Sequence, residues 1–312
     1  MFRKSVYLAL TLLLSTPGVA PGQQAVSSIT QSRLFTNPSA PGTTVDANGT
    51  ALPEEESPSS TGDDSFGAQI ILKNQERRRS FGVFADFSVF HTNNVDLTPR
   101  RTRSDSFLAA NIGTTWRPAL SRELLAEVLV GSSLFRYNRA GELDFQKLYA
   151  GVGLSWLVPQ TQGIIAFGRY DFIEVLDSGN NELLQDHGFS MGVQKIFVFG
   201  RSHSLTTGLT GTTGLTTPRS QERDQAALFA AYHLKITRSF EADVLYRYAA
   251  QFYAEGDRMD HNQTLSLALG FVPNRWLRVV GSISAARNDS TQSPFDYEVL
   301  NFGGGLRLEI AF

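Results

Sequence analysis

The chain has 312 residues, a formal net charge of −2 at neutral pH and no cysteine. The small net charge gives no support for a nucleic-acid-binding surface, and the lack of cysteine excludes disulfides, thiol catalysis and cysteine-ligated metals. Apolar residues make up 41% of the chain and charged residues 19%, a balance that fits neither a helical membrane protein nor a disordered one.

Residues 1–22 have the layout of a secretory signal peptide. Arg3 and Lys4 precede an apolar run over residues 6–14, and small residues follow, which is the order of the basic, apolar and cleavage regions of such a signal. The apolar run is too short for a membrane helix, which needs about 20 residues. We expect cleavage after Ala20 or Gly22; a buried N-terminal helix is the alternative.

The next region is expected to lack a fold of its own. Residues 23–65 are rich in Ser, Thr, Pro, Gly and Ala, and such a composition cannot bury enough apolar surface to offset the entropy lost on ordering. We therefore predict a disordered linker there. Residues 66–80 form a short segment before the folded region, which is either amphipathic or part of a first hairpin.

From Phe81 onward, apolar and polar residues alternate with a period of two, which is typical of β-strands. We predict that residues 81–312 form one domain, divided by turn residues into twelve strands. The expected ranges are 81–90, 104–117, 122–136, 143–157, 162–172, 185–198, 202–213, 222–236, 239–253, 258–271, 275–288 and 297–312.

Alternating strands fit either a soluble sandwich or a membrane barrel whose apolar rows face lipid. The connections after even-numbered strands are tight, whereas those after odd-numbered strands are mostly longer, as in outer-membrane barrels. The expected strands are also longer than the roughly 5–6 residues of soluble sheets. We therefore predict an all-β fold, a transmembrane antiparallel up-and-down barrel of about 12 strands.

Large aromatic residues fall near the expected strand ends, where amphipathic rings favour the two membrane interfaces. The alternative is that these rings cap a soluble core. The expected girdle residues are Trp116, Trp156 and Trp276 beside short turns, and Tyr170, Phe172, Phe252 and Tyr297 beside longer loops.

The last strand, "NFGGGLRLEIAF", ends on an apolar row that includes Leu308, Ile310 and Phe312. A barrel pairs this strand with the first one, and its apolar row then needs lipid. The glycine-containing strand ending in Phe resembles the C-terminal signal that the outer-membrane barrel assembly machinery recognises. That resemblance implies the assembly machinery and the lipid bilayer as partners.

A wider resemblance covers residues 81–312. "DFSVFHTNNVDLTP" resembles the opening strand and first loop of putative beta-barrel porins, and "FDYEVLNFGGGLRLEIAF" resembles their closing hairpin. The resemblance implies a barrel in the outer membrane of a Gram-negative bacterium, and the even number of expected strands puts the N-terminal segment in the periplasm. It implies little about the solute.

Alternation also predicts which charges face the interior, where water or opposite charges tolerate them. The expected lumen-lining charges are Glu123, Glu127, Lys147, Arg169, Asp171, Lys235, Glu241, Asp243, Arg247, Arg307 and Glu309. Asp86, Asp186 and His233 share this face. We expect a charge ladder between two neighbouring strands, from Glu241 and Asp243 to His233 and Lys235. An acidic excess would favour cations slightly; an interior filled by salt bridges is the alternative.

Catalytic chemistry has weak support in the sequence. The five histidines are scattered without metal-site spacing, so we expect no metal and no cofactor. Asp186–His187 and Asp260–His261 lie near the expected outer rim, where omptin proteases of the outer membrane use an Asp–His pair. His261–Asn262 resembles part of the Ser–His–Asn arrangement of outer-membrane phospholipase A, but no matching serine segment is present.

We therefore expect a porin-like protein and not an enzyme. The predicted function is a narrow channel for small polar solutes. A structural or export-accessory barrel, for example in exopolysaccharide secretion, is the alternative, and a surface hydrolase is a third.

Overall fold

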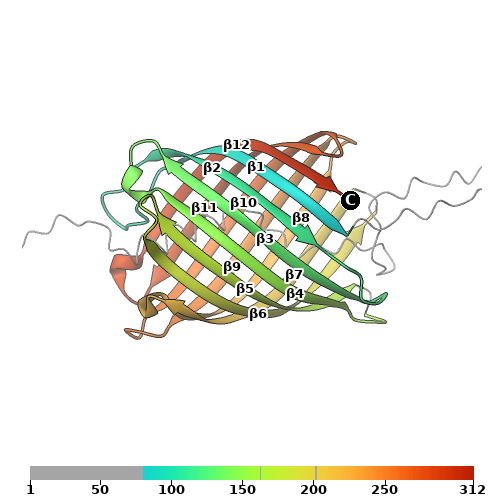
Figure 1. Cartoon of the computed structure of the whole chain (residues 1–312), viewed down its shortest axis with the longest axis horizontal. Helices are drawn as coiled ribbons and strands as arrows, with labels where there is room; N and C mark the ends of the chain where they lie inside the picture. The colour runs from blue at the N-terminus through green and yellow to red at the C-terminus, as the bar shows by residue number, and fades with distance from the viewer. Residues whose placement is uncertain (1–79, 162, 201) are drawn as a thin grey trace, which may run out of the picture.

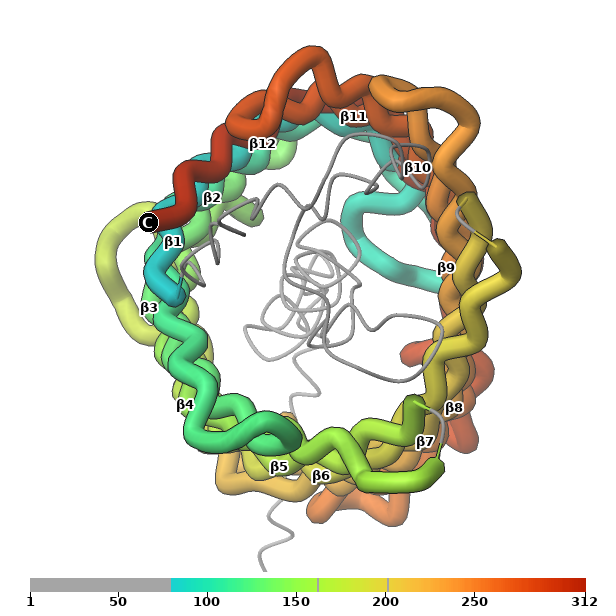
Figure 2. Tube along the Cα trace, turned by 90° about the vertical axis from the view of Figure 1, so that its right-hand side faces the viewer, coloured from blue at the N-terminus to red at the C-terminus, as the bar shows by residue number. Residues whose placement is uncertain are grey.

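The computed structural model describes residues 80–161, 163–200 and 202–312. They form a closed barrel of twelve antiparallel strands in which each strand pairs with its sequence neighbours and β12 pairs with β1 (Figures 1 and 2). The predicted barrel fold is confirmed. The expected signal peptide and linker, and residues 66–79 of the segment before the barrel, lie outside the described residues.

The strand bounds follow the predicted alternation closely. The strands are β1 Phe81–Thr92, β2 Asp105–Trp116, β3 Leu124–Tyr137, β4 Phe145–Leu157, β5 Ile164–Asp177, β6 Glu182–Phe199, β7 His203–Thr217, β8 Arg223–Lys235, β9 Phe240–Tyr253, β10 Met259–Asn274, β11 Leu277–Ser290 and β12 Tyr297–Ala311. Short 3-10 helices, η1 Gly141–Leu143, η2 Arg219–Gln221 and η3 Ser293–Phe295, lie in the connections. None of the helices in the described ranges has the length and hydropathy needed to cross a membrane.

Apolar side chains recur at alternate positions along the strands and are exposed on the outer surface. On β10 the exposed row is Leu265, Leu267 and Leu269, and on β12 it includes Leu306 and Leu308. A closed single-layer cylinder offers no second sheet to cover these rows. The period of two thus produces an apolar outer surface, which is the surface that a lipid environment favours.

The connections differ less in length between the two ends than the sequence predicts. The end with short turns, here the turn end, carries residues 117–123, 158–163, 200–202, 236–239 and 275–276, together with the C-terminus. The opposite end, here the loop end, carries residues 93–104, 138–144, 178–181, 218–222, 254–258 and 291–296.

The difference arises mainly where β5 and β6 continue past their predicted ends. β5 reaches Asp177 and β6 begins at Glu182, so the expected long loop is reduced to residues 178–181. Val175 pairs with Leu184 across the two strands, and both side chains are fully buried in one apolar cluster. Burial of these two residues favours extending the ladder over leaving a polar loop.

Glycines allow the first and last strands to approach closely where the barrel closes. β1 and β12 pair from Gly82 with Ala311 to Thr92 with Asn301. A Cβ atom on Gly303 would lie 2.2 Å from the Val89 carbonyl oxygen, which is too close for any side chain. Small residues on β12 are therefore a steric requirement of closure.

Candidate functional site

The inner face of the barrel is identified by side chains that contact one another across an intervening strand. The Tyr149 hydroxyl on β4 donates to Asn111 Oδ1 on β2 at 2.8 Å, and Arg169 Nη1 on β5 donates to Glu127 Oε1 on β3 at 3.0 Å. Adjacent strands lie about 4.8 Å apart, so contacts over two spacings require converging side chains. Side chains converge on the concave side, which is the lumen.

Charged residues concentrate on the inner face in the half nearer the turn end. On β9, Glu241 Oε1 lies 2.7 Å from Arg278 Nε, and Asp243 Oδ2 accepts a hydrogen bond from Arg278 Nη2 at 2.7 Å. The other oxygen of Asp243 lies 2.7 Å from His233 Nδ1. The structure thus brings together the expected His233–Asp243 rung of the ladder.

The second expected rung is replaced by a residue that sequence analysis left out. Lys235 aligns with Glu241 in the β8–β9 register, but Glu241 pairs with Arg278 of β11. Arg278 comes two residues after the tight turn at residues 275–276. Alternation counted from that turn did not decide whether its side chain points into the lumen or outward. Its signal in the sequence was weak for this reason.

A second group of paired charges lies on β3 to β5. Glu127 accepts from Arg117 Nε at 2.7 Å and from Arg169 Nη1 at 3.0 Å, and Arg169 Nε donates to Asp171 Oδ1 at 2.6 Å. Gly151 on β4 provides the room, because a Cβ atom there would lie 2.8 Å from Arg169 Nη2. The sequence predicted three of these charges but neither Arg117 nor the role of the glycine.

The third group lies at the β1–β12 closure. Arg307 Nε is 3.3 Å from Glu309 Oε2 and 3.7 Å from Asp86 Oδ1, and Asn111 donates to the other oxygen of Asp86 at 3.0 Å. Each carboxylate in these three groups therefore has a basic side chain within ion-pair distance.

The remaining expected lumen charges take different positions. Lys147 is buried on β4, with its Nζ 5.1 Å from the centre of the Tyr149 ring. Arg247 aligns with Thr264 on the inner face of the β9–β10 ladder. Glu123 differs from the prediction, because β3 begins at Leu124. Its side chain accepts a hydrogen bond from the Ser121 hydroxyl of the turn at 3.3 Å, while its carbonyl oxygen accepts from the Leu157 N–H of β4 at 2.7 Å.

Most of the expected girdle residues point outward. Trp116, Trp156 and Trp276 are 49%, 47% and 48% exposed at the turn end, and Tyr170 and Phe252 are also exposed. Phe172 lies on the same outer face of β5, with its ring centre 5.1 Å from that of His187.

Tyr297 corrects the predicted girdle. This residue is only 8% exposed, and its hydroxyl accepts a hydrogen bond from Asn262 Nδ2 at 3.0 Å. Tyr297 opens β12 on the same face as Asn301 and Arg307, because residues two apart share a face. It therefore belongs to the inner wall at the loop end.

The connection between β1 and β2, residues 93–104, lies inside the barrel wall at the loop end; we call it the mouth loop. In the view along the barrel, this teal segment runs inside the outline of the wall beside β9 and β10 (Figure 2). Leu97 packs with Ala286, Tyr297 and Val299 on the inner face of β11 and β12. The mouth loop therefore folds inward and occupies part of the opening.

A second apolar contact anchors the mouth loop on the other side. Val95 packs into a cluster of inward-facing residues from β1 to β6 and the β3–β4 connection. The other buried members of the cluster are Phe90, Phe107, Phe135, Tyr137, Ala140, Leu143, Phe145, Val175 and Leu184. Val95 and Leu97, two positions apart, are thus buried in two different clusters.

Polar contacts complete the anchoring. Asn94 is 0% exposed, and its Nδ2 donates to the carbonyl oxygens of Thr98 and Glu298, each at 2.9 Å. Its Oδ1 accepts from the Thr98 N–H at 3.2 Å. The first half of the mouth loop is therefore fixed to β12 by one buried amide.

Arg103 holds the second half. Its Nη2 donates to Asp96 Oδ1 at 2.9 Å and lies 2.7 Å from Glu142 Oε1 on η1. The pKa of Glu142 is lowered, first by a hydrogen bond from its own backbone N–H and then by the Arg103 guanidinium. Arg100 and Arg101 are exposed and form no ion pair with any residue that the structure describes.

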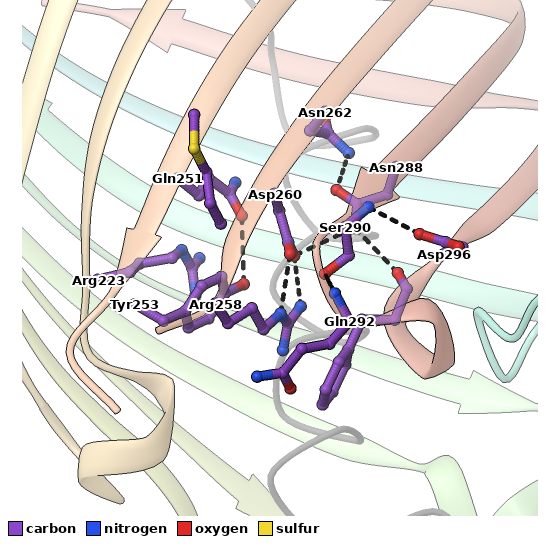
Figure 3. A network of polar contacts seen from close by, with 12 residues as sticks. Arg223, Gln251, Tyr253, Arg258, Asp260, Asn262, Asn288, Ser290, Gln292 and Asp296 are labelled. Carbon is purple, nitrogen blue, oxygen red and sulfur yellow. Dashed lines mark hydrogen bonds and ion pairs between the residues drawn. The ribbon is translucent and has the colours of Figure 1, made fainter. Parts of the chain in front are cut away.

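A stacked arginine lies at the loop end between β9 and β10 (Figure 3). The Arg258 guanidinium lies 4.0 Å from the centre of the Tyr253 ring and 3.4 Å from that of Phe295, and it pairs with Asp260. Asn288 Nδ2 donates to the same carboxylate at 3.1 Å. The carboxylate of Asp260 is therefore fully engaged.

Neither Asp–His dipeptide forms a catalytic pair. The Tyr170 hydroxyl lies 2.8 Å from His187 Nδ1 and the Tyr248 hydroxyl 2.6 Å from His261 Nδ1, both on the outer face. Asp186 faces the lumen and accepts from the Thr216 hydroxyl at 2.6 Å. Neighbouring residues in a strand point to opposite faces, so the two groups in each dipeptide are separated by the wall.

No protein-family model and no curated protein matches the sequence. Among solved structures, an outer-membrane channel from Pseudomonas putida F1 superposes with a TM-score of 0.51 at 8% identity, over 75% of this chain and 95% of that one. The β domain of the Bordetella autotransporter BrkA gives a TM-score of 0.48 at 10% identity, over 74% and 100%. The superposition on the Pseudomonas putida channel and the closed twelve-stranded barrel show that this chain has the fold of outer-membrane β-barrel proteins, which confirms the predicted resemblance to that class.

Proposed function

We propose that the protein is a channel that lets small polar solutes cross the outer membrane of a Gram-negative bacterium. The observation that carries the proposal is the contrast between the two faces of one sheet. The outer rows are apolar and exposed, whereas the inner face carries three groups of paired charges. Arg or Lys on a lipid-facing strand costs about 2–4 kcal/mol at mid-membrane, so this distribution suits a hydrated lumen.

The orientation follows from the general asymmetry of such barrels. Short turns face the periplasm and longer loops face outward, so we place the turn end and both chain termini on the periplasmic side. The mouth loop then lies at the external opening and narrows it on one side. The exposed terminal residues Leu308, Ile310 and Phe312 are available to the assembly machinery, as the sequence resemblance implies.

The expected mild cation preference loses its basis in this arrangement. It rested on an excess of inward carboxylates, but Arg117 and Arg278 were not counted, and each pairs with a carboxylate that was counted. The balance of inward charge is therefore closer to neutral than the sequence predicts. A solute would pass between paired groups of both signs.

Conductance in planar bilayers tests the proposal. The mature chain should give discrete open levels. In a salt gradient, Glu127→Gln should shift the reversal potential in the direction of greater anion permeability, because Arg117 and Arg169 lose their shared carboxylate in the lumen. Glu174→Gln removes the same charge from the outer face of β5 and should leave the reversal potential unchanged. A silent bilayer would contradict the channel and favour the accessory role.

A further inference from the structure

We propose that the outer surface at the turn end binds anionic phospholipids, whose phosphate groups contact Lys195 and the arginines of the tight turns. The inference goes beyond the proposed channel. It rests on the lipid-facing outer surface and holds whether or not the barrel conducts. It concerns which lipid lies against the protein, a choice that the fold alone does not specify.

Charge on the outer face is distributed unequally between the two ends. Every outward-facing carboxylate of the described strands lies in the half nearer the loop end. These residues include Glu174, Asp224, Asp289 and Glu298. Arg136 and Arg287 share that half and are fewer than the carboxylates. In the half nearer the turn end, Lys195 is the only outward side chain on the described strands with a full charge.

Lys195 lies on β6 beside the β4–β5 turn, because its register partner is Ile164, the first residue of β5. Trp156 aligns with Ala166 and so lies one outward row nearer the middle of the barrel than Ile164. The Lys195 Nζ atom is 5.1 Å from the centre of the Phe197 ring. The ammonium group therefore sits just past a tryptophan, at the level where a lysine on a lipid-facing strand reaches the headgroups.

The tight turns supply further cations. Arg122 lies in the connection after β2, Arg238 in that after β8 and Arg275 in that after β10, and all three are exposed. Arg275 directly precedes Trp276. In the part of the chain that the structure describes, none of these guanidinium groups forms an ion pair, and neither does the Lys195 ammonium. Four of the five turns thus carry an unpaired cation in or beside them.

The acidic groups of the turn end do not cancel these cations. Among the described residues, those without an ion pair there are Glu123 and the terminal carboxylate at Phe312. Inward carboxylates of the same half, such as Glu127, Glu241 and Glu309, are in ion pairs, and the wall separates them from lipid. The outer rim of the turn end is therefore positive.

A phosphate-bearing lipid fits this rim better than an acidic protein does, because the cations lie beside outward aromatic side chains that favour the membrane interface. Phosphate accepts charge-assisted hydrogen bonds from both ammonium and guanidinium groups. Each Lys or Arg near an anionic membrane surface raises the affinity about fivefold. We therefore expect the turn end to prefer an anionic headgroup over a zwitterionic one by about two- to fivefold, and less as salt is raised.

Tryptophan fluorescence reports on this surface, because all three tryptophans of the chain, Trp116, Trp156 and Trp276, are exposed at the turn end. The mature full-length chain is placed in phosphatidylcholine bilayers with a rising fraction of brominated phosphatidylglycerol or, as reference, brominated phosphatidylcholine. Bromine quenches tryptophan only at short range. The brominated phosphatidylglycerol should quench more strongly at equal mole fraction, with a relative binding constant of about two to five that falls in high salt.

The triple variant R122Q/K195Q/R275Q removes the unpaired cation beside each tryptophan and should bring the relative binding constant close to one. The matched variant R136Q/R139Q/R287Q removes three exposed cations at the loop end and should retain the wild-type constant. Heat-modifiable migration in detergent gels verifies that each variant has formed its barrel.

Three results would overturn the inference. The first is a wild-type constant of one. The second is an equal fall in R136Q/R139Q/R287Q, which would assign the effect to overall charge. The third is an unchanged constant in R122Q/K195Q/R275Q, which would leave the basic rim to an acidic protein partner. None of these readouts depends on conductance, so failure of this inference and failure of the proposed channel are distinguishable.

Discussion

Replacing Asn94 with alanine tests whether the mouth loop is held in place at the opening. The side chain is 0% exposed and makes three hydrogen bonds, two to Thr98 and one to the carbonyl oxygen of Glu298. Asn94→Ala removes all three and leaves their partners without the amide. The barrel wall keeps its own ladder, so the change should act on the mouth loop alone.

The size of the effect follows from those contacts. A hydrogen bond contributes about 0.5–1.5 kcal/mol net, and a buried group left unpaired costs about 1–3 kcal/mol. Three lost bonds therefore destabilise the closed position of the mouth loop by about 2–4 kcal/mol. Since 1.4 kcal/mol is a factor of about ten, the open population should rise at least about 30-fold.

Limited trypsin digestion measures that population, because Arg100 and Arg101 lie in the middle of the mouth loop. When opening is fast relative to cleavage, the cleavage rate follows the open population. The rate in Asn94→Ala should therefore exceed the wild-type rate by about 30-fold or more. Asn138→Ala is the matched control, because Asn138 is exposed in another connection and its side chain makes no hydrogen bond in the described part of the chain.

The reasoning is refuted if both variants are cut at the wild-type rate. It is also refuted if the wild-type loop is already cut as fast as an unfolded segment, since the anchors would then have no effect. The heat-modifiable migration of Asn94→Ala should match that of the wild type, which separates loop opening from loss of the barrel.

Three further predictions concern the lumen, the closure and pH. Arg278→Gln should shift the reversal potential in the direction of greater cation permeability, because Glu241 and Asp243 lose their shared partner. Arg287→Gln on the outer face should leave the reversal potential unchanged. Gly305→Ala should destabilise the barrel by about 1–3 kcal/mol in thermal gel-shift assays, because its Cβ would lie 2.2 Å from the Phe87 carbonyl oxygen, and Gly281→Ala, which has open space, should not. The lowered pKa of Glu142 means that its contact with Arg103 is complete above the ordinary value of 4.5 and is lost as pH falls through the lowered pKa. Current noise from the mouth loop should therefore rise in acid, and Glu142→Gln should show no such change.

Alternation predicted the strands, and the sorting of tight and longer connections together with the strand length favoured a barrel over a sandwich. The strand ends were predicted less well where the deciding contacts are between strands. Val175 and Leu184 lie in stretches that read as polar loop, yet they meet in a buried cluster. That cluster gathers residues from six strands, and no local window of the sequence contains it.

The same limit applies to the inner face. Alternation identifies Glu127 and Arg169 as inward residues, but their contact depends on the register of three strands and on the space that Gly151 leaves. Pairing decides the net field of the lumen, so a count of inward carboxylates overestimates the acidity. Arg278 is an example, because its direction was undecided from the sequence and it pairs with two of the expected inward acids.

The mouth loop is longer than its connection requires. Antiparallel neighbours can be joined by two residues, as β10 and β11 are at residues 275–276, whereas residues 93–104 join the equally adjacent β1 and β2. Ordering each residue costs about 1–2 kcal/mol, and the buried side chains of Asn94, Val95 and Leu97 offset part of that cost. Anchors of this kind serve no purpose in a simple link. They are explained if the segment has to stay inside the barrel wall at the opening.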